Sequence, residues 1–286
     1  SSGTETPPHP DDCKIRIGAA WDSGRRGRME DAHTALPALQ GDSRYALMAV
    51  YDGHSGKAAA QWVGENMPGL LYNYLLAFPG DTMLAMQKAC IECDRLVCGN
   101  EEIRSSCGTT ACLCLIDFVN GKLVCANVGD SRALVIMKDN QGRRLSNDHN
   151  GKDEQEKERI RRMLGGLVRG DRVEGTSLLY TFNCKTKNLG ALACARAIGD
   201  ADIKPSATAD PLIIEVDLKD VKGVVIGCDG VWDVVKDQKA VDVVVKELEA
   251  NKSTMEKCAL AANALVKHAY KKGSEDNISV VIGSFL

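Results

Sequence analysis

The sequence predicts an α+β fold, in which antiparallel β-sheets are covered by α-helices, and three observations support this prediction. Short strand-like segments follow one another directly, whereas helical segments come in blocks between them, unlike the regular alternation of a βαβ protein. The chain has 286 residues, of which 44% are hydrophobic and 26% charged, as in ordinary globular domains. No segment after residue 12 resembles a linker, so we expect residues 13–286 to form one domain.

Eight short segments rich in apolar residues predict the strands. Several are apolar at every position, which is typical of strands buried on both faces, and others alternate. In chain order the expected strands are residues 15–21, 45–51, 110–116, 123–128, 133–137, 212–216, 223–228 and 278–282.

Four further segments have the features of helices. Residues 57–76 are the first, with a break expected at Pro68 because proline removes a helix hydrogen bond. Residues 83–97 keep a helical period of apolar residues, and residues 154–164 carry the charges of an exposed helix. A capping-box spacing at residues 253–256 predicts that the last helix begins there.

The N-terminal residues 1–12 are expected to be a flexible segment. They are polar, contain three of the eight prolines and lack the apolar stretch of a secretory signal. The net charge of -3 provides no basic excess to attract nucleic acid or an anionic membrane. We therefore expect a monomeric cytoplasmic protein, with the nucleus as a further compartment, that binds neither nucleic acid nor membranes.

The 12 cysteines are expected to be reduced thiols inside the protein. Five of them lie in apolar strand-like segments, where a free thiol behaves as a small hydrophobic side chain: Cys112, Cys114, Cys125, Cys194 and Cys228. The group Cys90, Cys93 and Cys98 leaves a zinc site as the alternative, but no second Cys-x-x-Cys completes a tetrahedral set. We favour the structural interpretation.

Acidic residues stand at the ends of three predicted strands. Asp52 and Asp229 each follow an apolar strand, and Asp276 precedes another. If the last strand runs antiparallel to the other two, all three carboxylates project from one edge of the core. Each Asp-Gly pair alone is more simply a turn, but their joint occurrence favours a common site.

Carboxylate oxygens without accompanying imidazole or thiolate ligands select Mg²⁺ or Mn²⁺ rather than zinc. Several carboxylates that converge fit two metals about 4 Å apart, an arrangement that activates water for phosphoryl transfer. The sequence therefore predicts a dinuclear Mg²⁺ or Mn²⁺ centre.

Eight short motifs resemble, in the same order, those of the metal-dependent serine/threonine phosphatases of the protein phosphatase 2C family. The matching segments are residues 26–33 (RGRMEDAH), 51–56 (YDGHSG), 108–111 (GTTA), 127–132 (NVGDSR), 147–149 (NDH), 195–200 (ARAIGD), 228–233 (CDGVWD) and 274–277 (SEDN). The resemblance implies two packed antiparallel sheets flanked by helices, and hydrolysis of phosphoserine and phosphothreonine in proteins.

The resemblance also implies which residues bind the metals. Asp52 corresponds to the carboxylate that bridges both ions, and Gly53 to the residue whose carbonyl binds one of them. Asp229 and Asp276 correspond to ligands of the other ion.

Four more residues receive roles from the first two motifs. Glu30 corresponds to the residue that holds metal-bound water, and Asp31 to the residue that supports it. Arg26 corresponds to the phosphate clamp, since a guanidinium matches two phosphate oxygens, although an arginine in a solvated loop is the alternative. His54 corresponds to the general acid that protonates the leaving oxygen.

A weaker third metal is expected by resemblance to some family members. Asp130 and Asp233 match its ligands together with Asp229, and Thr110 matches a position near that site. Asp130 could instead fix a turn between two strands.

A flap is expected beside the site at residues 165–190. It contains or adjoins several basic residues that could attract phosphorylated or acidic segments of a substrate, or that simply face solvent. These residues are Arg161, Arg162, Arg169, Arg172, Lys185 and Lys187.

The reaction implied is direct attack of a metal-bridging hydroxide on phosphorus, without a covalent phosphoenzyme. Two alternatives remain: a catalytically silent phosphoprotein-binding module, and a two-metal enzyme acting on a nucleic-acid phosphodiester.

Overall fold

The computed structural model describes residues 1–164, 170–173, 176–183 and 188–286. Its largest sheet has six antiparallel strands in the order β1-β2-β17-β16-β9-β10. Their bounds are Ser2–Glu5 (β1), Ile15–Asp22 (β2), Ile278–Phe285 (β17), Val221–Gly227 (β16), Arg132–Met137 (β9) and Gly142–Arg144 (β10).

A second sheet has five antiparallel strands in the order β15-β8-β7-β4-β3. Their bounds are Leu212–Asp217 (β15), Lys122–Val128 (β8), Ala111–Asp117 (β7), Tyr45–Tyr51 (β4) and Ala32–Leu36 (β3). The two sheets pack face to face, and the predicted class of two antiparallel sheets flanked by helices is confirmed.

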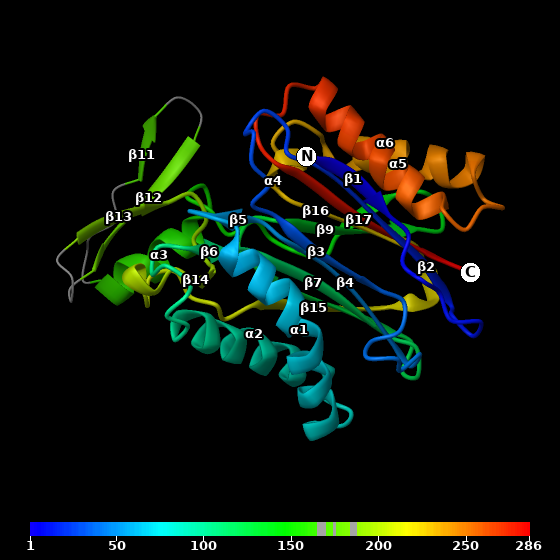
Figure 1. Cartoon of the computed structure of the whole chain (residues 1–286), viewed down its shortest axis with the longest axis horizontal. Coiled ribbons are helices and arrows are strands. Elements are labelled where there is room, and N and C mark those ends of the chain that lie inside the picture. Colours follow the sequence, from blue (N-terminus) through cyan, green and yellow to red (C-terminus); the bar gives the residue numbers. More distant parts are fainter. Residues whose placement is uncertain (165–169, 174–175, 184–187) are drawn as a thin grey trace.

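Two pairs of helices cover the outer faces of the sheets. Figure 1 shows α1 (Ala58–Ala77) and α2 (Thr82–Cys98) against one sheet, and α5 (Asp237–Ala250) and α6 (Lys257–Lys271) against the other. The molecule therefore has four layers, and each sheet is buried on both faces.

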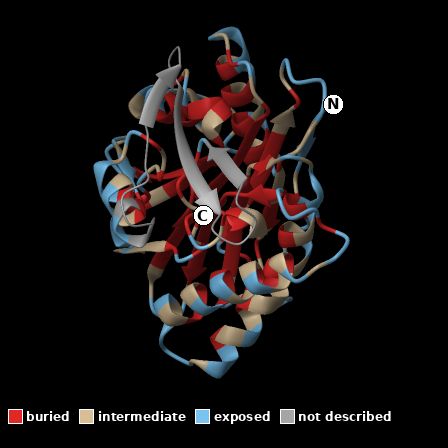
Figure 2. Ribbon diagram, turned by 90° about the vertical axis from the view of Figure 1, so that its left-hand side faces the viewer, coloured by how far each residue is buried: buried red, intermediate tan, exposed pale blue. Residues whose placement is uncertain are grey.

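This layering explains why the predicted strands are apolar at nearly every position. In β16, Val224 and Ile226 face the second sheet, whereas Val225 between them packs against α5 and α6. Figure 2 shows the buried strands at the centre and the exposed residues on the outer sides of the helices. Because successive side chains point to opposite faces, a strand between two covered faces must be apolar throughout.

Two small sheets lie at one end of the sandwich. A three-stranded sheet joins β14 (Ile198–Gly199), β6 (Gly108–Thr109) and β5 (Gly53–His54). Another joins the strands β11 (Gly170–Val173), β12 (Thr176–Asn183) and β13 (Asn188–Leu192). The helices α3 (Glu154–Leu164) and α4 (Asp229–Trp232) and the short 3₁₀ turns Ala201–Ile203 and Leu218–Asp220 complete the described chain.

The expected flap falls partly outside the described residues. Its described part contains β11, β12 and most of β13, and its basic side chains are not among those described, apart from Arg162 on α3. The proposed attraction of acidic substrate segments therefore stays a prediction.

Three local predictions are wrong. Residues 2–5 of the segment expected to be flexible form β1, because their backbone pairs with β2 from Ser2–Asp22 to Glu5–Ala19. Helix α1 continues through Pro68, since its buried stripe, which includes Met67 and Leu71, packs on the sheet and outweighs one lost hydrogen bond.

The third correction concerns the start of α6. The helix begins at Lys257, after the expected capping box, and the Thr254 hydroxyl donates instead to the carbonyl of Asn251 in a preceding turn. Helix α5 was not predicted at all from the sequence.

Two further expectations can be compared with the described residues. The cysteines among them are all free, and all but Cys98 are buried, as the structural interpretation predicts. No described helix combines the length and the hydropathy that crossing a membrane requires.

Candidate active site

The ends of strands from both sheets meet around one cavity. Asp229 directly follows Cys228 at the end of β16, and Asp276 lies just before β17, which runs antiparallel to β16. Asp52 follows β4 of the other sheet. The cavity has a volume of about 430 Å³. Its lining residues are Arg26, Arg28, Glu30, Asp52, Gly53, His54, Ser55, Thr110, Asp130, Ala193, Cys194, Asp229, Asp276 and Asn277.

Eight of the ten residues predicted for the site line this cavity, and the other two lie beside it. Asp31 is buried behind the cavity, where its carboxylate accepts a hydrogen bond of 2.7 Å from the Ser279 hydroxyl. Asp233 is exposed and lines a neighbouring cavity together with Trp232. Eight of the predicted residues therefore share one cavity, Asp31 lies buried behind it, and Asp233 lies outside it.

The backbone at Asp52 is held by Thr110. The amide of Asp52 donates to the Thr110 hydroxyl at 3.1 Å, and the amide of Thr110 donates to the Asp52 carbonyl at 2.9 Å. The Thr110 hydroxyl also lies 2.7 Å from that of Ser131. Thr110 thus holds the backbone of the Asp52 turn through both its amide and its hydroxyl.

Glycine is required at position 53 by the close approach of another chain segment. A Cβ atom there would lie 2.2 Å from the carbonyl oxygen of Glu30, a distance that side chains do not tolerate. The Asp52-Gly53 turn and the Glu30-Asp31 segment can therefore pack against each other only without a side chain at Gly53.

One cluster at the cavity has donor atoms at metal-binding spacing, although Cys228, one of its members, does not line the cavity. Single ligand atoms of Asp52, Cys228 and Asp229 all lie within 4.8 Å of one another. The Oδ1 atom of Asp229 is buried and has no hydrogen-bond partner among the described residues. A buried carboxylate oxygen without a partner is costly, so this atom fits a ligand for a cation.

The carboxylates of the site repel one another. Burial, and after it the charge of Asp229, holds the pKa of Asp52 well above its usual range, and the same causes act on Asp130. Burial raises the pKa of Asp31 to about 7 against the effect of its Ser279 hydrogen bond. Burial and the charge of Asp276 raise the pKa of Asp229 to about 6. Such a group of oxygens fits hard divalent cations, which would offset its charge.

The loop that carries Arg26 and Glu30 is fastened by Asn277. The Asn277 side-chain amide donates to the carbonyls of Ser23 and Arg28 at 2.9 and 2.7 Å, and its oxygen accepts from the Glu30 amide at 2.8 Å. Arg26 itself is exposed and pairs with Asp276 at 2.7 Å. Asn277 is the residue whose importance the sequence did not reveal, although it belongs to the quoted SEDN motif.

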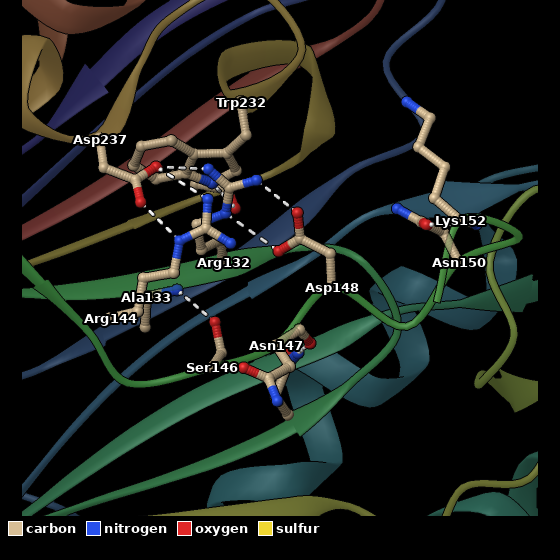
Figure 3. Close-up of polar contacts among 12 residues, drawn as sticks. Arg132, Ala133, Arg144, Ser146, Asn147, Asp148, Asn150, Lys152, Trp232 and Asp237 are labelled. Atoms are coloured by element: carbon tan, nitrogen blue, oxygen red, sulfur yellow. Dashed lines mark hydrogen bonds and ion pairs between the residues drawn. The ribbon is translucent and has the colours of Figure 1, made fainter. Parts of the chain in front are cut away.

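A group of paired charges lies beside the cavity, next to Asp233. Figure 3 shows the Arg132 guanidinium between Asp148 and Asp237, with Arg144 also bonded to Asp237. The Arg132 side chain is 9% exposed and lies over the ring of Trp232 at 5.1 Å. We call Arg132, Arg144, Asp148 and Asp237 the ion-pair cluster. Unlike the cavity, it contains as many cations as anions.

The comparisons with known proteins point to one family. The family model described as Protein phosphatase 2C matches residues 16–278. The rice (Oryza sativa subsp. japonica) protein named Probable protein phosphatase 2C 32 is 35% identical over 90% of this chain, which spans 62% of that relative's length. Protein phosphatase 2C homolog 1 of Saccharomyces cerevisiae is 28% identical over 97% of this chain and 96% of its own.

A solved structure supports the fold. The serine-threonine phosphatase 2C from Toxoplasma gondii superposes with a TM-score of 0.80 and 21% identity, covering 100% of both chains. At this identity the likeness establishes the fold alone.

Proposed function

The chain belongs to the protein phosphatase 2C family, and from this premise we propose that it is a metal-dependent phosphatase of phosphoserine and phosphothreonine residues in proteins. The observation that carries the proposal is the cavity in which Asp52, Asp229 and Asp276 meet without an equal number of cations. The arginine at its rim, Arg26, supports a phosphate monoester as the substrate group.

The donors around the cavity suit two ions, for which we propose Mg²⁺ or Mn²⁺. Asp52 would bridge them, the Gly53 carbonyl would bind one, and Asp229 and Asp276 would bind the other. When bound, the ions would supply an activated water and would stabilise charge on the phosphoryl group.

Residues around these ligands would complete the centre. Glu30 would hold water bound in the cavity, and Asp31 would support Glu30 from its buried position. We further propose that Asp130 and Asp233, with Asp229, form a weaker third site, which the mutual repulsion of these carboxylates supports.

The remaining groups of the site act on the substrate directly. The Arg26 guanidinium would bind two phosphoryl oxygens and orient the phosphorus toward the carboxylate cluster. His54, which lines the same cavity, would give a proton to the departing serine or threonine oxygen as the P–O bond breaks. Phosphoproteins are the proposed partners, and nucleic acid is disfavoured by the net charge of -3.

The test measures phosphate release from a phosphothreonine peptide with Mg²⁺, with Mn²⁺ and with a chelator. We expect metal-dependent release that Asp52→Asn abolishes and that the control Asp139→Asn, at an exposed turn, leaves intact. An oligonucleotide offered in parallel should not be cleaved. Absence of release from a folded, metal-binding chain would contradict the proposal and favour a silent phosphoprotein-binding module.

A further inference from the structure

The His54 side chain contacts a buried carboxylate to which the sequence assigned no role. Its Nε2 atom lies 2.9 and 2.8 Å from the two carboxylate oxygens of Asp200. The Asp200 side chain is 2% exposed, whereas that of His54 is 25% exposed and reaches the cavity. Among the described residues, His54 is the only side chain that hydrogen-bonds to the Asp200 carboxylate.

The surrounding backbone is shaped to hold this carboxylate in place. Asp200 has a left-handed backbone with φ 53°, a conformation that costs free energy in a residue with a side chain. A Cβ atom at position 108 would lie 2.2 Å from an Asp200 carboxylate oxygen, so only glycine fits there. The Asp200 amide donates to the Cys107 carbonyl at 3.0 Å.

The small sheet fixes the distance between the two residues. Strand β5 ends at His54, pairs with β6, and β6 pairs with β14, after which Asp200 follows directly. The contact between His54 and Asp200 is therefore set by backbone pairing over three strands and does not depend on a mobile surface side chain.

We infer that Asp200 is a positioning residue for the proton transfer by His54, an inference that rests on the proposed function. With Nε2 directed at Asp200, the ring nitrogen left to face the substrate is Nδ1, which has no hydrogen-bond partner among the described residues. The Nδ1–H bond breaks as the P–O electron pair moves to the leaving oxygen, and the proton goes to that oxygen. Nε2–H stays bonded to Asp200 throughout, which holds the ring plane and selects the donating nitrogen.

Leaving groups of different acidity can separate this role from a structural one. The alkoxide of threonine needs a proton as it leaves, whereas p-nitrophenolate is stable without one. Loss of a general acid costs about 10²- to 10⁴-fold in rate where the proton is needed. We therefore expect Asp200→Asn to lower kcat for a phosphothreonine peptide by about 10- to 100-fold, less than the loss of the acid itself, because His54 is still present.

For p-nitrophenyl phosphate the same variant should keep kcat within about threefold, and KM for both substrates should change little, since Arg26 and the carboxylates are untouched. The control is Asp139→Asn, an aspartate at an exposed turn whose carboxylate accepts from the Gln141 amide. We expect this control to leave both substrates unaffected. Thermal unfolding and Mn²⁺ binding of each variant report whether the fold is kept.

A double variant sharpens the test. If Asp200 acts through His54, adding Asp200→Asn to His54→Gln should cause almost no further loss with the peptide, because coupled residues are not additive. Equal loss with both substrates, full additivity, or no effect of Asp200→Asn would each overturn the inference. Failure of the unaltered chain to hydrolyse either substrate would instead contradict the proposed function.

Discussion

Two adjacent groups of charged side chains differ in how their charge is balanced. In the ion-pair cluster, Arg132 and Arg144 face Asp148 and Asp237. Burial alone would raise the pKa of Asp237, but hydrogen bonds and charge from Arg144 and Arg132 lower it. In the cavity, burial and neighbouring carboxylates raise the pKa of Asp52 with no such compensation.

The ion-pair cluster therefore stabilises the fold, whereas the carboxylates of the cavity would be balanced only by a bound cation. Removing a carboxylate from a balanced cluster leaves an arginine unpaired, whereas removing one from the cavity relieves repulsion in the metal-free protein. Stability and activity should therefore respond in opposite ways to the same chemical change made at the two places.

The largest effect is expected when one aspartate of each group is replaced by asparagine, in two separate variants. Asp52→Asn should lower phosphatase kcat by at least about a thousandfold, since several kcal/mol of charge stabilisation is lost, yet it should raise the thermal midpoint of the metal-free protein. Asp237→Asn should keep kcat within about threefold and lower that midpoint. Assays with the phosphopeptide and calorimetry of both variants provide the check, and equal behaviour would remove the distinction.

The next effect concerns the centre of the ion-pair cluster. Arg132→Met leaves Asp148 and Asp237 without their shared partner and removes the cation over Trp232. We expect the free energy of unfolding to fall by about 3 kcal/mol, the lower end for breaking a buried pair because both carboxylates are partly exposed. Urea unfolding measures it. The exposed Arg143→Met should change this free energy by less than about 0.5 kcal/mol.

Without metal, the carboxylates of the cavity should make the stability of the protein depend on pH. The folded chain has a pKa of about 7 for Asp31 and of about 6 for Asp229, both above the unfolded value of about 3.9. The folded state then binds more protons between about pH 4 and 7, so stability of the chelated protein should decrease as pH rises through this window.

Saturating metal should oppose that decrease. Mg²⁺ or Mn²⁺ at a hundred times its Kd adds about 2.7 kcal/mol at neutral pH, where the ligands are free of protons. Thermal scans from pH 4 to 7 with chelator and with metal measure both effects. A chelated protein that gains stability with rising pH would show that the carboxylates are balanced by charges on the protein.

The smallest effect is expected at the rim of the cavity. Arg26→Gln should raise KM for the phosphopeptide about tenfold, about 1.4 kcal/mol, because one charge-assisted contact to phosphate is lost. Arg25→Gln, whose guanidinium lies over the exposed ring of Tyr270 instead, should change KM by less than twofold or so. Steady-state kinetics measure KM for both variants. Equal increases in KM would show that the phosphate is bound by the positive charge of the whole loop and not by Arg26 alone.

The fold and the cavity could be predicted because both depend on local patterns. Apolar strands that end in Asp-Gly turns identify the layers and place Asp52 and Asp229 at the edges of the sheets. Helix α5 was not predicted, since no helical pattern was recognised over Asp237–Ala250. Its buried valines nevertheless face the six-stranded sheet.

The supporting residues could not be predicted, since their partners are far away in the sequence. Asn277 bonds to residues about 250 positions earlier, and Asp200 meets His54 across 146 positions. Strand β1 was missed because pairing with β2, and not its polar sequence, orders it. Long-range contacts of this kind leave no periodic signal in a single sequence.

The cavity lies where the edges of the two sheets meet, so its carboxylates come from both sheets. Asp52 borders the five-stranded sheet, whereas Asp229 and Asp276 border the six-stranded sheet. A cation shared among them would bridge two layers that otherwise meet through apolar side chains, and either layer would lose a ligand if its edge frayed. Amide hydrogen exchange at the ends of β4 and β16 should accordingly slow together when metal is added, although no backbone hydrogen bond joins the two strands.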